Sequence, residues 1–315
     1  MKFSIIIPTY NEQNDIINTL DSISLQTYRK FEVIIVDDSN DNTYEIIKKY
    51  KKIPINLIKP QKRYGRSEAR NIGLKSSTGN VCIILNADVL LPKYFIEKIK
   101  VYYDQGYQAV TVYSEVVNLE NKYARYIGLH HYWKIKRKVY KKREKNLNDI
   151  WWSEGFSVER SIAMKTSLFP SGFSMPIVAG EDVAFVNDLR KLNCRAISDE
   201  NIVVKHKAPD TFLEFWSTRV GRGEGTPQIR SFIDKWSLKK IFIVISVKSL
   251  IRLIRFLNIF PMLIYSIRLA QFSNQKYYML EILILSKLWF LEQLAFSYGE
   301  FKCLINLIFT RKKND

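Results

Sequence analysis

Two carboxylates come at the ends of strongly apolar runs in the sequence. Asp38 closes "FEVIIVDD", and Asp88 closes "CIILNAD". An acid at the end of a buried strand is fixed by a rigid backbone. It can accept hydrogen bonds from a ribose or a base, and it can hold a divalent ion that bridges two phosphates. A turn former or helix cap is the alternative for Asp38. Asp88 favours the metal role more strongly, because it would otherwise lie beside a second apolar run.

A second acidic pair marks the start of a predicted helix over residues 179–192. Glu181 and Asp182 come directly after Gly180 in "AGEDVAF". Neighbouring acids at such a place can be poised as a general base, and the glycine allows a ligand to approach the backbone closely. Capping of the helix N-terminus is the alternative.

Two cations lie four residues apart in "GRSEARNIGL", where Arg66 and Arg70 share one helix face. A pair of guanidinium groups aimed at one cleft suits a diphosphate. The alternative is a solvated helix in which they form ion pairs with Glu68 or Glu12.

Apolar runs and helical patterns alternate over residues 3–103, which predicts the elements that position these groups. Strands are expected at 3–9, 31–39, 55–60 and 81–88, and helices at 14–25, 43–50, 67–76 and 93–103. This order predicts an α/β fold with a doubly wound, mainly parallel sheet. Ligands bind such sheets at the carboxyl ends of the strands, where the polar clusters fall.

Five short motifs occur in register: "IIIPTYNE", "VDDS", "EARNIGL", "LNADVLL" and "GEDVAF". In this order they resemble the inverting, nucleotide-sugar-dependent glycosyltransferases of family 2, which have a GT-A (Rossmann-like) fold. The resemblance covers residues 3–235. It implies a GT-A domain over 1–235, followed by a C-terminal apolar and basic helical region over 236–315.

The resemblance implies a donor pocket whose residues come from several motifs. It assigns nucleotide binding to Pro8, Thr9, Tyr10, Glu12 and Asp38, with Arg70 near the diphosphate and Asn86 and Ala87 beside it. The donor is expected to be a UDP- or GDP-linked sugar.

The resemblance also implies a metal and a catalytic base. Asp88 matches the last acid of the family's Asp-x-Asp motif and would hold Mn²⁺ or Mg²⁺, with His206 in "IVVKHKAP" helping. Asn86 departs from that motif, but its amide oxygen still accepts a hydrogen bond. Asp182 matches the base that deprotonates the acceptor hydroxyl.

Arg219 and Arg222 lie in the glycine-rich segment "TRVGRGEG". This looks like the family's Arg-Gly segment, and its composition suits a mobile loop that closes over phosphates. A plain linker to the C-terminal helices is the alternative.

The formal net charge is +18, and residues 235–315 hold 13 Lys/Arg against 4 Asp/Glu. In this region Lys248, Arg252 and Arg255 fall within about 60° on one helix. We expect amphipathic helices in a membrane interface, with the basic stripe facing anionic headgroups. A soluble helical subdomain, an oligomer interface, and one or two spanning helices are the alternatives.

The start of the chain and its cysteines bear on location. The apolar run before Pro8 is too short for a signal-peptide core, and the three cysteines form no CxxC pair. Both observations favour the cytoplasmic face of the cell membrane.

The leading hypothesis is transfer of one sugar to a lipid-linked or cell-surface glycan acceptor, with inversion. A basic nucleic-acid-binding protein is a second hypothesis, prompted by eight Lys/Arg between Lys134 and Lys145. It leaves the acids unexplained, so no nucleic-acid partner is expected. A non-catalytic GT-A scaffold is the third.

Overall fold

The computed structural model describes residues 1–61, 65–138, 143–144 and 154–311. The chain divides into two compact units. Unit 1 comprises Met1–Glu115, Tyr140–Pro176 and Glu181–His206, and unit 2 comprises Val116–Val139, Ile177–Gly180 and Lys207–Asp315. Within the basic stretch at 134–145, residues 139–142 and 145 lie outside the described residues.

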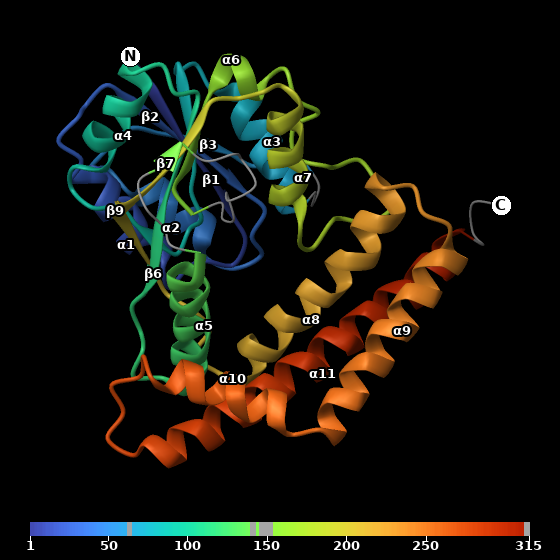
Figure 1. The fold of residues 1–315 in the computed structure, drawn as a ribbon. Coiled ribbons are helices and arrows are strands. Elements are labelled where there is room, and N and C mark those ends of the chain that lie inside the picture. Colours follow the sequence, from blue (N-terminus) through green and yellow to red (C-terminus); the bar gives the residue numbers. More distant parts are fainter. Residues whose placement is uncertain (62–64, 139–142, 145–153, 312–315) are drawn as a thin grey trace. The chain divides into compact units, whose positions relative to one another are not determined.

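Unit 1 is built on one sheet (Figure 1), with β6 ending at the unit boundary. The strands are β1 (Phe3–Thr9), β2 (Phe31–Asp37), β3 (Ile55–Ile58), β4 (Val81–Ile84), β5 (Val89–Leu90), β6 (Ala109–Val116), β7 (Arg143–Glu144), β8 (Phe156–Glu159) and β9 (Ala196–His206). In the described residues their order is β3-β2-β1-β4-β8-β6-β9-β5, and β7 pairs with β9. The first four strands are parallel, and the pairings β4–β8, β5–β9, β6–β8 and β7–β9 are antiparallel.

Helices cover both faces of this sheet. They are α1 (Ile16–Ser24), α2 (Thr43–Lys49), α3 (Arg66–Ser76), α4 (Phe95–Asp104), α6 (Arg160–Ala163) and α7 (Glu181–Lys191). One core lies between the sheet and α1, α2 and α4, and a second lies between the sheet and α3, α6 and α7. Ile5 and Ile6 point to opposite faces and are both fully buried. A strand covered on both sides explains the unbroken apolar run.

The predicted α/β architecture of the first hundred residues is confirmed. Strand Phe3–Thr9 has the predicted bounds, and the helices lie within two residues of theirs. The fourth strand is shorter than predicted, because β4 ends at Ile84 and the chain turns through Asn86–Asp88. The parallel order is limited to the first four strands, since later segments return antiparallel.

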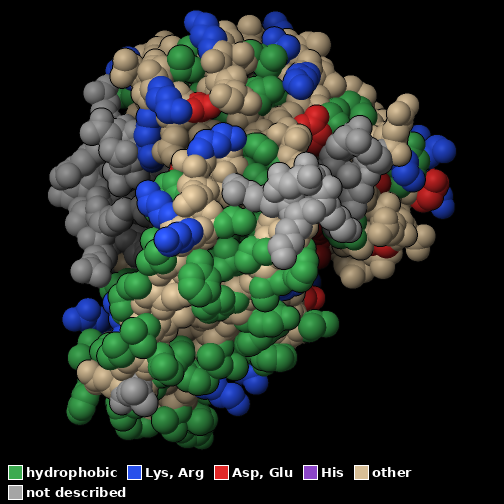
Figure 2. All heavy atoms as spheres, turned by 90° about the vertical axis from the view of Figure 1, so that its right-hand side faces the viewer, with side chains coloured by type: hydrophobic (Ala, Val, Ile, Leu, Met, Phe, Trp, Pro, Cys, Tyr) green, Lys and Arg blue, Asp and Glu red, His purple; other side chains and the backbone are tan. Residues whose placement is uncertain are grey.

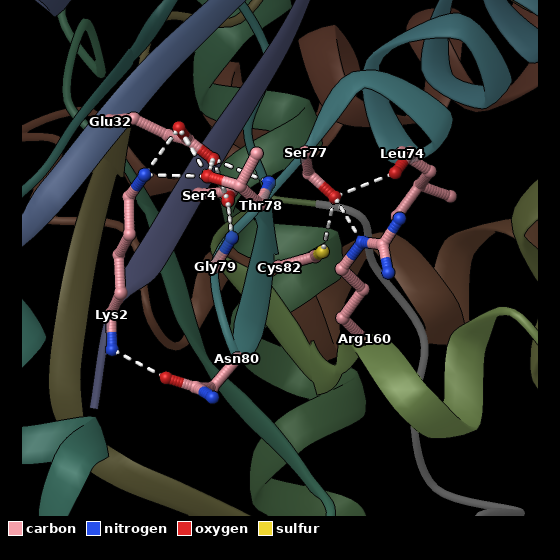
Figure 3. A network of polar contacts seen from close by, with 10 residues as sticks. All are labelled: Lys2, Ser4, Glu32, Leu74, Ser77, Thr78, Gly79, Asn80, Cys82 and Arg160. Carbon is pink, nitrogen blue, oxygen red and sulfur yellow. Dashed lines mark hydrogen bonds and ion pairs between the residues drawn. The ribbon is translucent and has the colours of Figure 1, made fainter.

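A polar network ties the amino-terminal end of the sheet together (Figure 3). Glu32 on β2 accepts hydrogen bonds from Lys2 Nζ at 2.7 Å and from Ser4 Oγ at 2.6 Å. The backbone N–H of Thr78 donates to the same carboxylate at 2.7 Å. Desolvation opposes ionisation, but these contacts outweigh it and lower the pKa of Glu32 to about 2. The network links β1 and β2 to the turn that precedes β4.

Unit 2 is helical in its described residues. It contains α5 (Lys122–Lys138), α8 (Phe212–Gln228), a π-helical turn (Ile229–Ile233), α9 (Leu238–Leu257), α10 (Phe260–Ala270) and α11 (Tyr278–Arg311). Helix α11 packs along α8, and a Cβ on Gly223 would lie 2.1 Å from the backbone oxygen of Phe296. Only glycine allows such a close approach. None of the helices described has both the length and the apolar character needed to cross a bilayer.

Candidate active site

The carboxyl ends of β1 and β2 are joined by hydrogen bonds between side chains. Thr9 Oγ1 donates to Asp37 Oδ1 at 2.6 Å, and Ser39 Oγ donates to the same oxygen at 2.7 Å. The backbone N–H of Asp38 donates to the Thr9 carbonyl at 3.0 Å. Asp37 is fully buried, so it fixes the edge on which Asp38 lies.

Asp38 reaches the start of α3. The backbone N–H of Gly65 donates to Asp38 Oδ2 at 3.2 Å. Gly65 has φ of +80°, and a Cβ there would lie 3.0 Å from Pro176. A left-handed backbone at this point therefore favours glycine. Pro8 and Glu12 are half-buried and Tyr10 is 38% exposed, so the "PTYNE" residues lie along the same edge.

The turn after β4 brings Asp88 to His206. Strand β5 pairs with β9 so that Val89 lies opposite His206. His206 Nε2 lies 3.1 Å from Asp88 Oδ2 and 3.9 Å from Glu154 Oε1. Thr19 Oγ1 donates to the Ala87 carbonyl at 2.6 Å and fixes the turn from α1. The two predicted metal ligands, far apart in the sequence, are thus neighbours.

Asp88 has the properties of a cation ligand. Burial alone would raise the pKa of Asp88, but His206 outweighs it, so the pKa lies below the usual value. Asp88 Oδ1 is buried and has no hydrogen-bond partner among the described residues. A divalent ion would satisfy that oxygen, so Asp88 and His206 fit a metal. No three His, Cys, Asp or Glu side chains in the described part of the chain converge as a complete metal site.

Glu12 lies in the same electrostatic environment. Burial, followed by the charges of Asp88 and Asp15, raises the pKa of Glu12 to about 7. Unlike Asp88, Glu12 lacks a cation strong enough to offset its burial. Crowded carboxylates of this kind are typical of functional sites.

Arg70 of α3 is fully buried. Its Nη1 donates to Glu181 Oε1 at 2.8 Å and its Nη2 to Asn86 Oδ1 at 3.1 Å. Its guanidinium carbon lies 5.1 Å from the ring centroid of Phe169. One side chain of α3 therefore links the turn after β4 to the start of α7. Arg66 Nη1 is 3.5 Å from the same carboxylate oxygen, and its side chain is 54% exposed.

Asp182 follows Glu181 in the first turn of α7 and is half-buried. Burial, followed by the charge of Glu181, raises the pKa of Asp182 above its usual value. Arg70 forms an ion pair with Glu181, so the two adjacent acids have different environments. A raised pKa makes the Asp182 carboxylate a stronger proton acceptor.

Arg219 and Arg222 lie in α8 of unit 2, so the prediction of a mobile loop over this segment is wrong. Arg219 is buried, and its Nε lies 2.8 Å from Glu292 Oε1 on α11. Close packing of α8 against α11 makes the glycine-rich sequence helical.

Glu154 was missed by the sequence analysis. Ser114 donates a hydrogen bond to Glu154 Oε2, and Glu154 Oε1 approaches His206. In the sequence it is a single acid in "WWSEGF", with no spacing that sets it apart from other acids.

The fold and the carboxylates at the sheet edge define a glycosyltransferase of the GT-A fold. The chain matches the model of Glycosyl transferase family 2 over residues 4–166, about half its length, and it belongs to this family. The expected family is thereby confirmed.

Two curated relatives match shorter stretches. The chain is 36% identical over 93 residues to the amylovoran biosynthesis glycosyltransferase AmsB of Erwinia amylovora, covering 28% of this chain and 31% of AmsB. It is 34% identical over 116 residues to the poly(ribitol-phosphate) beta-N-acetylglucosaminyltransferase TarS of Staphylococcus aureus, covering 35% of this chain and 20% of TarS. The chain thus spans about a third or less of either relative.

Two solved structures share the fold. TarS 1–349 of S. aureus, in complex with UDP-GlcNAc, superposes with a TM-score of 0.55 at 20% identity, covering 74% of this chain and 68% of that one. The mannosyltransferase PcManGT of Pyrobaculum calidifontis, in complex with GDP-Man and Mn²⁺, has a TM-score of 0.56 at 22% identity, covering 75% and 65%. These likenesses confirm the predicted GT-A fold.

Proposed function

We propose that the protein transfers one sugar from a nucleotide-diphosphate sugar to a glycan or lipid-linked acceptor, with inversion. The observation that carries the proposal is the pairing of two features in unit 1. Asp88 Oδ2 and His206 Nε2 lie 3.1 Å apart at the sheet edge, where they would suit a cation. Asp182, with a raised pKa, lies at the start of α7. A cation site for a diphosphate and a base for a hydroxyl are the two groups that a single displacement requires.

Asp182 is the general base of the proposed reaction. Its carboxylate takes the proton of the acceptor hydroxyl while that oxygen attacks the anomeric carbon. The bond from the anomeric carbon to the diphosphate breaks on the opposite face, so the configuration inverts. The raised pKa of Asp182 strengthens it as a proton acceptor.

Asp88 and His206 would hold Mn²⁺ or Mg²⁺ together with the donor phosphates. A divalent ion with few protein ligands is commonly completed by substrate phosphates. Such an ion would neutralise charge on the departing nucleotide diphosphate. His206 orients Asp88 through the 3.1 Å contact, and Glu154 lies beyond it as a further acid.

Thr9 and Asp37 hold the edge that presents Asp38 to the nucleotide. We assign the exposed Arg66 to the diphosphate, because its guanidinium is accessible. Arg70 and Asn86 act as positioning residues, since Arg70 is buried against Glu181. Donor contacts of Pro8, Tyr10, Glu12 and Ala87 belong to the same proposal. Arg219 and Arg222 are predicted donor residues that the site in unit 1 does not include.

The proposed acceptor is a lipid phosphate or a cell-surface glycan, reached at the cytoplasmic face of the membrane. The relatives AmsB and TarS, by their names, act in amylovoran biosynthesis and on poly(ribitol-phosphate). An anionic surface suits a chain with a net charge of +18.

A panel of UDP- and GDP-sugars tests the donor. We expect one class to raise the melting temperature, with a larger shift when Mn²⁺ is present, because a ligand stabilises the state that binds it. With the selected donor and a polyprenyl phosphate, the product should carry the inverted anomeric proton coupling by NMR. Retention would contradict inversion, and binding without transfer to any acceptor would favour a non-catalytic scaffold.

A further inference from the structure

The acids of helices α9, α10 and α11 all point inward. In the described residues these helices contain three carboxylates, and each lies in an ion pair with an arginine of unit 2. Arg125 Nε is 2.9 Å from Glu281, Arg219 Nε is 2.8 Å from Glu292, and Arg252 Nη1 is 2.5 Å from Glu300. Glu281 and Glu300 are buried, and Glu292 is 15% exposed.

The cations of the same helices are distributed differently. Seven of their Lys and Arg side chains are exposed: Lys239, Lys240, Lys248, Arg255, Arg268, Lys287 and Lys302. Among the described residues only Lys302 of these seven has a carboxylate partner, Glu224 at 2.5 Å. The ionised surface of the described parts of α9–α11 is therefore cationic, with the carboxylates withdrawn from it.

Large apolar side chains lie between these cations. At about 100° per residue, five exposed residues of α9 fall within an arc of about 100°. They are Ile243, Val247, Leu250, Ile251 and Ile254, each 44–57% exposed. We call this arc the α9 face. Figure 2 shows hydrophobic side chains gathered broadly over the C-terminal helices, with Lys and Arg at the margin of the green area.

Two cations of α9 lie along one edge of this face. Lys248 and Arg255 project within about 60° beyond the edge of the apolar arc. The opposite side of the helix carries Ile241 and Ile245, which pack with Leu304 of α11. Arg252 is also on that side, paired with Glu300, so the expected stripe of three outward cations is reduced to two.

Helix α10 and the start of α11 carry further exposed apolar residues. Phe260 is 70% exposed, Ile264 48%, Met279 73% and Leu283 63%. Apolar area of this extent is unusual on a protein that only water surrounds.

We infer that the α9 face lies in the interface of an anionic bilayer, with the helix parallel to the membrane plane, Lys248 and Arg255 contacting the headgroups, and the five apolar side chains entering the acyl boundary. This inference rests on the membrane location proposed above. The charge distribution selects lipid over a second copy of the chain. Two copies facing each other through this surface would bring like charges together, whereas anionic headgroups complement them.

Vesicle binding by the full-length protein tests the surface. The probes are phosphatidylcholine vesicles with and without one quarter phosphatidylglycerol, at low and high salt. We expect binding to the anionic vesicles that weakens with salt, because exposed charges are screened. Val247→Ser/Ile251→Ser/Ile254→Ser should reduce partitioning at least about tenfold on these vesicles. Lys248→Gln/Arg255→Gln should reduce it about five-fold per cation.

Matched variants from unit 1 are the controls. Leu25→Ser/Val101→Ser/Leu192→Ser removes three apolar residues that are 62%, 51% and 40% exposed, and Lys51→Gln/Lys165→Gln removes two exposed cations. These should change partitioning less than about twofold. An unchanged donor-induced thermal shift in every variant checks that the fold and the donor site are intact.

Three results would overturn the inference. If the wild-type protein binds but the α9 variants match the controls, another surface contacts the membrane, and the proposed location survives. If the wild-type protein binds neither vesicle, the proposed membrane location is wrong as well. The proposed transferase activity is still tested independently by the panel of nucleotide-sugars. If the apolar variant converts a dimer into a monomer in light scattering and binds vesicles like the controls, the face is covered by a second copy.

Discussion

Arg70 donates to Asn86 Oδ1 at 3.1 Å while its other terminal nitrogen donates to Glu181 Oε1 at 2.8 Å. The amide at position 86 thus serves as an acceptor for a cation whose charge Glu181 already neutralises. A second carboxylate is not needed to balance Arg70. This contact accounts for Asn86 at the position of the first acid in the Asp-x-Asp motif.

Replacement of Arg70 should lower the free energy of unfolding. Arg70→Gln would leave the buried Glu181 carboxylate without its main counterion, and we expect unfolding to become easier by about 3–5 kcal/mol in urea titrations. Arg66→Gln is the control, since its side chain is 54% exposed and should contribute less than about 1 kcal/mol. Equal effects of the two changes would contradict the positioning role of Arg70.

Restoring an acid at position 86 tests the neighbouring metal site. Asn86→Asp keeps an oxygen acceptor for Arg70 and adds negative charge near Asp88. Donor affinity in Mn²⁺, measured by calorimetry, should be kept or tightened. Weaker binding together with lost activity would mean that the donor itself contacts the amide.

Asp182→Asn should remove the base without removing the donor site. We expect turnover to fall at least about a hundredfold while donor affinity stays within about threefold. The wild-type rate should rise with pH on its acidic side, because the base acts deprotonated, and its pKa lies above the usual value. Loss of donor binding in this variant would exclude the assigned role.

Removal of the proposed metal ligands should abolish the effect of Mn²⁺ on donor binding. Asp88→Ala should abolish any Mn²⁺-dependent gain in donor affinity, and His206→Gln should reduce it. EDTA should have the same effect on the wild-type protein, with recovery on adding Mn²⁺. Turnover that EDTA does not affect would refute the metal role.

The network around Glu32 predicts a dependence of stability on pH. The folded-state pKa of about 2 is below the ordinary value of 4.5. The contribution is therefore complete above about pH 4.5 and is lost as the pH falls toward 2. Because the carboxylate is partly exposed, we expect Glu32→Gln to cost only about 1–2 kcal/mol at pH 7.

The measurement is the difference in unfolding free energy between Glu32→Gln and wild type from pH 7 to pH 3. That difference should be constant above pH 5 and shrink below it. Glu115→Gln, at an exposed position with no partner among the described residues, should show no such change. A difference independent of pH would contradict the shifted pKa.

The strands of the sheet could be predicted from the sequence more accurately than the contacts of the polar side chains. The run Phe3–Thr9 predicts a strand with correct bounds, because burial on both faces needs unbroken apolar residues. Arg66 and Arg70 were expected to share one environment. Their spacing fixes a common helix face but not which of them lies under α7, and one is exposed while the other is buried.

Two other differences come from packing between distant segments. The glycines around Arg222 predicted a loop, yet α11 covers α8 closely and makes the segment a helix, so tertiary contacts override propensity. Glu154 is in the site only because the antiparallel strands bring His206 to it. Such pairings are not encoded in local periodicity.

The buried arginines of unit 2 also limit where the chain can be cut. A fragment that ends at Lys235 would retain Arg125 and Arg219 but lose their counterions Glu281 and Glu292. It would also uncover the glycine face of α8 that approaches Phe296. We therefore expect such a fragment to aggregate, and a well-behaved recombinant protein to require the chain through α11.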